Sequence, residues 1–244
     1  ACRVGDVAAL IVEPLILGAG GMLIYGAATL AEMARICAKH RVLLIADEVM
    51  TGWGRTGTLF ACEQAGIAPD IVCVAKGLTG GALPLAATLA TADIFDAHFS
   101  PDRSRTFFHS SSYTANPIAC AAACANIEIW QTEPVIERVR ALEEMQRVCL
   151  TRFADDPRFS GVRQLGTITA LDVAVRDEGY LAAIGPKLYA AFMARNILLR
   201  PLGSTIYVMP PYCIEASELE MIYDAIEETV AAVDGDNPTQ PRSR

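Results

Sequence analysis

Three runs of hydrophobic residues in the first half of the chain have the length of buried β-strands. They cover residues 7–12, 42–46 and 71–75, and they contain no charged side chain. Continuous apolar runs of this kind are typical of parallel strands that are covered on both faces. Residues 29–40 show a helical pattern that Thr29 is placed to cap. The order strand, helix, strand then predicts a right-handed crossover unit.

The pattern predicts further elements along the rest of the chain. These are a short helix at 59–65, a strand at 84–91, a long helix from Asn116-Pro117, an amphipathic surface helix at 133–154, two short strands within 162–175, part of a helix at 186–195, strands at 196–200 and 205–209, and a last helix capped by Ser217 and reaching about residue 233. The change in pattern places a domain boundary near residue 132. We therefore expect a large-domain portion at 1–132, a small domain at 133–234 and a disordered tail at 235–244.

Two charged residues stand at the ends of neighbouring hydrophobic runs. Asp47 follows the second run, and Lys76 follows the third. Because ligands bind beyond the carboxyl ends of strands in open α/β sheets, both side chains are expected at one crevice. A lysine that forms a Schiff base and an acid that keeps a pyridine nitrogen protonated are what a pyridoxal phosphate enzyme requires. Taken alone, the two residues are better explained as a loop cap and a solvated amine.

Composition and charge exclude several classes of protein. The net charge is −8 and the basic residues are scattered, which argues against a nucleic-acid partner. No apolar stretch approaches the ~18 residues of a membrane span, and residues 1–12 do not resemble a signal peptide. The eight cysteines show no CxxC pairing and there are three histidines, so we expect no metal site. Such cysteine usage fits a reducing cytoplasm.

Glycine-rich and hydroxyl-rich segments mark candidate loops of the site. The segment 18–21 lacks the spacing of a nucleotide-binding loop and predicts only a tight turn near a cofactor. Glycines 52, 54 and 57 surround Trp53, so this loop is expected to pass close to another backbone or a ligand. The segment 107–114 precedes the helix that begins at Asn116-Pro117. It fits an anion site, but by itself an ordinary capped helix is the preferred interpretation.

Taken together, the motifs resemble the class III aminotransferases of fold-type I, which use pyridoxal 5'-phosphate. The resemblance runs from about residue 5 to 233 and rests on Glu13-Pro14, Ala46-Asp47-Glu48-Val49, residues 52–57, Pro69-Asp70, Lys76-Gly77 and Asn116-Pro117. It implies an α/β fold, consisting of the C-terminal part of the family's large cofactor-binding domain, with a mostly parallel sheet and flanking helices, and then a small α+β domain. It also implies that an N-terminal part of that large domain lies outside this chain.

The resemblance assigns cofactor roles residue by residue. Lys76 would be the catalytic lysine that holds the cofactor, and Asp47 would pair with the pyridinium nitrogen. Val49 would pack on the face of the ring. Ser112 stands where the family commonly has threonine, and together with Ser111 it would bind the phosphate of the neighbouring subunit's cofactor. A homodimer with its cofactor sites at the interface is therefore implied.

Three stretches, 78–81, 108–117 and 200–212, resemble a branch of the class that acts in biotin synthesis. That branch transfers an amino group from S-adenosylmethionine to 8-amino-7-oxononanoate. Arg200 would clamp a substrate carboxylate, as its planar fork suits. Tyr207 would shape the substrate pocket, whereas the role of Glu13, near the cofactor in the family, stays open.

Two other interpretations remain. One keeps the chemistry and changes the substrate to an ω-amino acid or a diamine. The other treats the chain as a truncated, non-catalytic remnant that binds the cofactor or pairs with a full-length subunit. A nicotinamide-binding domain is disfavoured, because the glycine spacing is wrong and no acidic residue follows at the ribose position.

Overall fold

A computed structural model describes residues 1–2, 5–109, 111–175, 179 and 181–235. The chain divides into two compact units. The first contains residues 1–16 and 25–136, and the second contains residues 17–24 together with the chain from 137 onward. The short segment 17–24 thus leaves the first unit and groups with the second, which nothing in its sequence indicates. The tail predicted at 235–244 lies almost wholly outside the described residues.

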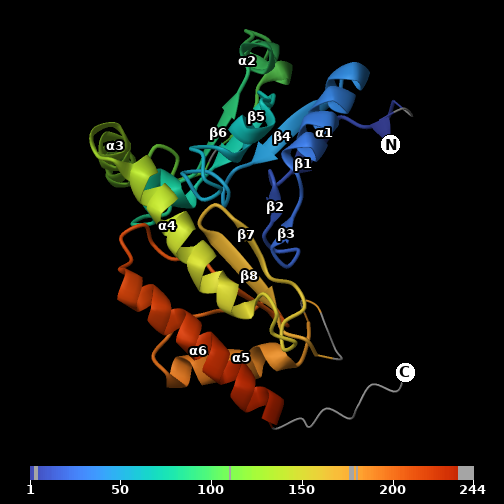
Figure 1. Cartoon of the computed structure of the whole chain (residues 1–244). Coiled ribbons are helices and arrows are strands. Elements are labelled where there is room, and N and C mark those ends of the chain that lie inside the picture. The colour runs from blue at the N-terminus through green and yellow to red at the C-terminus, as the bar shows by residue number, and fades with distance from the viewer. Residues whose placement is uncertain (3–4, 110, 176–178, 180, 236–244) are drawn as a thin grey trace. The chain divides into compact units, whose positions relative to one another are not determined.

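The first unit is built on a four-stranded sheet with the order β1-β4-β5-β6 (Figure 1). Strands β1 (Ala9–Val12), β4 (Leu43–Asp47) and β5 (Ile71–Val74) are parallel, as their hydrophobic runs predict. The fourth strand, β6 (Ala87–Ala90), runs antiparallel to β5 and is shorter than the predicted strand at 84–91. The prediction of an α/β fold with a mostly parallel sheet is confirmed.

Three α-helices belong to the first unit, and their ends test the predicted caps. Helix α1 (Ala27–His40) starts after Gly26, so the predicted cap at Thr29 is wrong. Helix α2 (Ala92–His98) follows β6. Helix α3 (Pro117–Thr132) is capped by Asn116, whose Oδ1 accepts hydrogen bonds from the next free N–H groups, as predicted. The helix predicted at 59–65 is a 3₁₀ turn over Ala61–Ala65.

The second unit combines an antiparallel three-stranded sheet and a small two-stranded sheet with three helices (Figure 1). Strands β7 (Arg163–Leu165), β8 (Ile168–Asp172) and β9 (Thr205–Val208) form one sheet, and β2 (Ile16–Leu17) pairs with β3 (Leu23–Ile24). The helices are α4 (Val135–Leu150), α5 (Ile184–Ala194) and α6 (Ala216–Gly235). Three predictions are corrected here. The strand predicted at 196–200 does not form, and the helix predicted at 133–154 gives way to a 3₁₀ turn at Thr151–Phe153. Ser217 is not the cap of the last helix, because α6 begins one residue before it.

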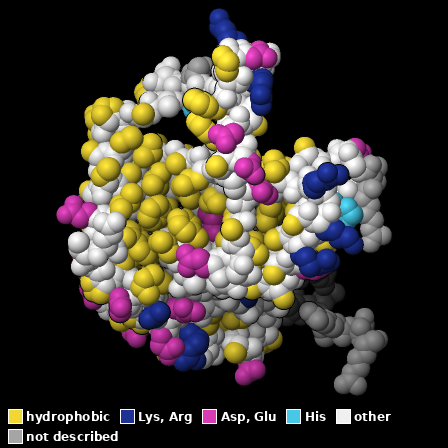
Figure 2. Space-filling model, turned by 90° about the horizontal axis from the view of Figure 1, so that it is seen from above, with side chains coloured by type: hydrophobic (Ala, Val, Ile, Leu, Met, Phe, Trp, Pro, Cys, Tyr) yellow, Lys and Arg dark blue, Asp and Glu magenta, His cyan; other side chains and the backbone are white. Residues whose placement is uncertain are grey.

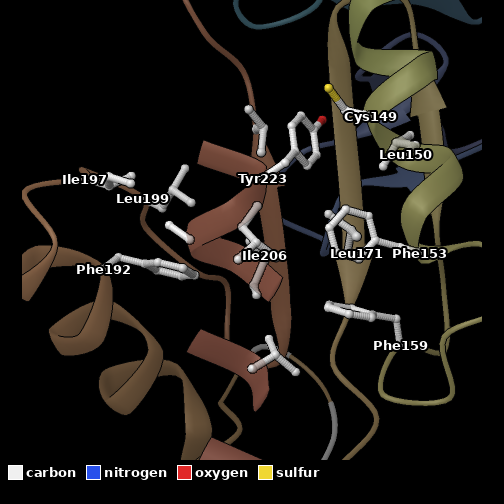
Figure 3. Packing of buried hydrophobic residues seen from close by; sticks show 14 of the residues in the cluster. Cys149, Leu150, Phe153, Phe159, Leu171, Phe192, Ile197, Leu199, Ile206 and Tyr223 are labelled. Atoms are coloured by element: carbon white, nitrogen blue, oxygen red, sulfur yellow. The ribbon is translucent and has the colours of Figure 1, made fainter. Parts of the chain in front are cut away.

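A large hydrophobic cluster fills the second unit (Figure 3). Phe153 packs edge-on against Phe159, with 5.1 Å between the ring centroids, and lies 6.0 Å from the Tyr223 ring. The hydroxyl of Tyr223 is satisfied inside this core by Gln146 and Thr169. Burial raises the pKa of Tyr223 far above its usual value, so its hydroxyl stays protonated.

An arginine holds the 17–24 hairpin within the second unit. The Arg163 guanidinium donates to the carbonyl oxygens of Gly21 and Met22 at 2.7 and 2.8 Å. It also pairs with the Asp172 carboxylate at 2.5 and 2.9 Å. The planar fork of arginine can make all these bonds at once. The glycine-rich turn at 18–21 is therefore fixed by β7 and β8.

Among the described residues, no helix is long and apolar enough to cross a bilayer.

Candidate active site

Asp47 is the last residue of β4, at the carboxyl end of the parallel strands. The register pairs it with Cys73 on β5, so Asp47 lies beside the end of the strand that leads into Lys76. Its Oδ1 accepts a hydrogen bond of 3.1 Å from the N–H of Val49, which fixes the direction of the carboxylate. Within the described part of the chain, Oδ2 accepts no hydrogen bond. One carboxylate oxygen is thus available to a ligand at the edge of the sheet.

Lys76 lies just beyond β5, at the start of a 3₁₀ turn over Lys76–Thr79. Its backbone has a φ of 37°, a region that side chains with a Cβ seldom adopt, so this residue is held in a strained conformation. The side chain is exposed, and its amine makes no ion pair or hydrogen bond with any described residue. The turn thus presents a free amine at the same edge of the sheet as Asp47.

Two contacts from distant segments hold the turn that carries Lys76. A Cβ placed on Gly77 would lie 2.6 Å from the Trp53 Cβ, so only glycine allows this approach. The prediction that the glycine-rich loop around Trp53 passes close to another backbone is confirmed. On the other side, Asn126 of α3 donates from Nδ2 to the carbonyl oxygens of Gly77 and Leu78 at 2.9 and 3.2 Å.

A buried carboxylate next to Asp47 organises the loop that contains Trp53. Glu48 has no exposed surface, and its Oε1 accepts a 2.9 Å hydrogen bond from the N–H of Cys62. Its Oε2 accepts a hydrogen bond from the hydroxyl of Thr51. Burial raises the pKa of the Cys62 thiol to about 12, and the charge of Glu48 adds to the shift. Glu48 thereby ties both ends of residues 51–62 to the end of β4.

Replacing Glu48 with alanine is expected to lower the free energy of unfolding by about 2 kcal/mol, because buried donors at Thr51 and Cys62 lose their acceptor. The matched control is Glu32→Ala, which removes an exposed carboxylate that pairs with Arg35 and should leave the stability almost unchanged. Urea unfolding followed by tryptophan fluorescence measures both variants. Equal denaturation midpoints for the two variants would contradict the structural role of Glu48.

The hydroxyl-rich loop and the second unit carry the remaining predicted site residues. Ser111 and Ser112 are exposed and precede α3. Because Asn116 already occupies the first free N–H groups of that helix, the ordinary capped-helix interpretation of its N-terminus is favoured. In the second unit, Arg200 is exposed and lines a shallow depression beside Pro201 and Leu202. Tyr207 is half-buried in β9, paired with Ala170 on β8.

The structure thus gathers Asp47, Val49 and Lys76 at one sheet edge of the first unit, while Arg200 and Tyr207 belong to the second. The supporting roles of Glu48 and Asn126 were not predicted from the sequence. A signal existed for Asn126, since it is a polar residue in an otherwise apolar stretch of helix. No group of three or more potential metal ligands occurs among the described residues.

Comparison with known proteins gives the family. The model of the family "Aminotransferase class-III" matches residues 3–230. The chain belongs to the class III aminotransferases. It is 47% identical over 228 residues to the adenosylmethionine-8-amino-7-oxononanoate aminotransferase of Synechococcus elongatus, covering 93% of this chain and 53% of that protein. The chain therefore spans about half the length of the curated relatives that it matches.

Two solved structures support the same fold. The adenosylmethionine-8-amino-7-oxononanoate aminotransferase of Methanocaldococcus jannaschii superposes with a TM-score of 0.85 at 32% identity, covering 92% of this chain and 53% of that one. An omega transaminase from Pseudomonas jessenii, solved in complex with PMP, gives a TM-score of 0.83 at 28% identity, with 93% and 51% covered. The chain thus belongs to a family whose members are PLP-dependent aminotransferases. A free amine and a carboxylate are the two groups that an enzyme must offer to this cofactor.

Proposed function

We propose that this chain acts in the transfer of an amino group from S-adenosylmethionine to 8-amino-7-oxononanoate, giving 7,8-diaminononanoate in biotin biosynthesis. The observation that carries the proposal is the 47% identity, over 93% of the chain, to a relative whose name states that donor and acceptor. The likeness to an omega transaminase at 28% identity supports a second candidate, the same chemistry on an ω-amino acid or diamine.

The residues at the sheet edge supply the chemistry that the protein must provide. Pyridoxal phosphate links amines covalently through its aldehyde and accepts the electron pair left when a substrate Cα loses its proton. Lys76 would hold the cofactor covalently and, once displaced by the donor, would move that proton as a base. Asp47 would keep a proton on the ring nitrogen, and Val49 would pack on the ring. Gly77 and Asn126 would keep Lys76 aimed at the site.

The remaining assignments follow from the family resemblance. Ser111 and Ser112 would bind the phosphate of the cofactor in a neighbouring subunit, so we infer a homodimer. Both hydroxyls are exposed, as a contact with a partner requires. All eight cysteines are free thiols, which supports a reducing, cytoplasmic location.

The amino donor separates the candidate functions. The purified chain is loaded with pyridoxal phosphate and mixed with S-adenosylmethionine or with alanine, and the visible band of the cofactor is followed. We expect S-adenosylmethionine alone to convert the cofactor to its amino form. Conversion by alanine alone would favour the ω-amino acid candidate. Conversion by neither donor would overturn transamination by this chain and favour the non-catalytic interpretation.

Arg200 is expected to bind the carboxylate of the acceptor. The change Arg200→Ala should raise the KM for 8-amino-7-oxononanoate by about 100-fold, because a charge-assisted, bidentate pair is lost. The KM for the donor should change less. Arg195→Ala is the control, since Arg195 is another exposed arginine of the second unit, facing Glu228. Unchanged acceptor kinetics in Arg200→Ala would remove this residue from the site.

A further inference from the structure

Helix α3 contains a polar side chain that its own composition does not explain. From Pro117 to Trp130 the helix consists mainly of alanine, isoleucine and cysteine, and Asn126 is its only amide or hydroxyl group. Asparagine is among the weaker helix formers, because its side chain competes for backbone hydrogen bonds. The molecule also has a face on which hydrophobic side chains cover a broad area, with few charged side chains among them (Figure 2). An amide in an apolar helix needs a polar partner, and Asn126 has its partner in the turn that follows Lys76.

The Asn126 amide spans this turn from one side to the other. Its Nδ2 donates to the carbonyl oxygens of Gly77 and Leu78 at 2.9 and 3.2 Å. Its Oδ1 faces Gly80, where an added Cβ would lie 3.3 Å from the oxygen. Ala123, three residues earlier on α3, packs in one hydrophobic cluster with Leu78. Helix α3 therefore holds the turn through one polar and one apolar contact.

The backbone of the turn has left-handed conformations at three positions. Lys76, Gly80 and Gly81 have φ values of 37°, 62° and 82°. Glycine adopts such values freely, whereas a residue with a Cβ keeps them only where its surroundings enforce them. Within the turn, the N–H groups of Gly80 and Gly81 donate to the carbonyl oxygens of Gly77 and Lys76 at 3.0 Å each. Because Asn126 donates to the same oxygen of Gly77, the helix and the turn stabilise one conformation of Lys76.

We propose that Asn126 is a positioning residue for Lys76. It binds the carbonyl oxygens of Gly77 and Leu78, and in this way it keeps Lys76 in its left-handed conformation with the amine at the sheet edge. Since Asn126 acts through the backbone, its loss should slow the formation of the link between Lys76 and the cofactor. The proposal rests on the proposed function, because it requires Lys76 to hold the cofactor, and it adds a residue that is distant in the sequence.

Two variants of Asn126 and two controls separate positioning from stability. Asn126→Asp keeps the shape of the side chain but turns a donor toward two carbonyl oxygens into a second acceptor, and Asn126→Ala removes the donor without adding charge. Gln131→Glu is the matched control, since it makes the same amide-to-acid change at an exposed position of α3. Val42→Ala, in a different buried cluster of the first unit, is the control for lost stability. Far-UV circular dichroism confirms that the variants fold.

Amide hydrogen exchange tests the contact in the full chain without cofactor. In Asn126→Asp and Asn126→Ala, the N–H groups of Gly80 and Gly81 should exchange about tenfold faster or more, because the turn has lost its anchor on α3. In Gln131→Glu they should exchange as in the unchanged chain. Equal exchange in Asn126→Asp and Gln131→Glu would overturn the proposal.

Addition of pyridoxal phosphate tests the effect on Lys76. The rate at which the visible band of bound cofactor appears, and the label on Lys76 after borohydride reduction, should fall about tenfold or more in both Asn126 variants. Both controls should stay within about twofold of the unchanged chain. Label on Lys76 that is unaffected by Asn126→Asp would overturn this proposal alone. No label on Lys76 in the unchanged chain would overturn the proposed role of Lys76, and this proposal with it.

Discussion

Replacing Lys76 with alanine is expected to abolish both the visible band of bound cofactor and transamination, with a loss of rate on the order of 10⁴ or more. The reason is that one amine performs two tasks, since it holds the cofactor and moves the substrate proton. In the structure this amine is free and exposed at the end of β5. Its turn is fixed by Gly77 against Trp53 and by Asn126 from α3.

Borohydride reduction measures this assignment without relying on turnover. Reduction traps the link between a lysine and pyridoxal phosphate, and mass spectrometry of the peptides identifies the lysine. The chain has two other lysines, Lys39 on α1 and Lys187 on α5, which serve as internal controls. We expect label on Lys76 in the unchanged chain and in Lys39→Ala, and none in Lys76→Ala. Label that is spread evenly over the lysines would show that no specific site exists.

The second large effect is expected for Asp47→Asn. Asparagine has nearly the same shape but cannot hold a proton on the ring nitrogen, so the ring accepts electrons less well. We expect the rate to fall by about 100-fold or more, the loss typical of removing one preorganised electrostatic partner. Cofactor binding through Lys76 should persist, because the lysine belongs to a different strand end.

Asp93→Asn is the control for this change, since Asp93 is an exposed carboxylate in the first turn of α2. It should leave the rate within a factor of two. Single-turnover kinetics with excess donor measure the chemical step in both variants. A rate for Asp47→Asn equal to that of the control would show that the carboxylate does not serve the ring.

The parallel strands, and the sheet edge at which the candidate residues lie, were predictable because they depend on local sequence. Uninterrupted apolar runs identify β1, β4 and β5, and a parallel arrangement by itself brings Asp47 and Lys76 to one edge. Asn116 was predictable as a cap, because the side chain that satisfies a helix end is adjacent in sequence.

Features that depend on contacts across the chain were not predictable. The segment 17–24 groups with the second unit because Arg163, more than 100 residues away, binds its carbonyl oxygens. In the sequence, Glu48 looks like an ordinary charged residue next to Asp47. It is buried because the loop that leads to Cys62 folds over it, and this contact cannot be inferred from the neighbouring residues. The cap positions at Thr29 and Ser217 were wrong by a few residues, since several nearby residues can begin a helix.

We propose that Lys76 and Asp47 serve one pyridine ring, and a crystal structure of the chain with pyridoxal phosphate tests this most directly. It should show the cofactor joined to Lys76 Nζ, with an Asp47 carboxylate oxygen about 2.8 Å from the ring nitrogen. A cofactor joined to Lys39 or Lys187, or an Asp47 carboxylate directed away from the ring that Lys76 holds, would contradict it.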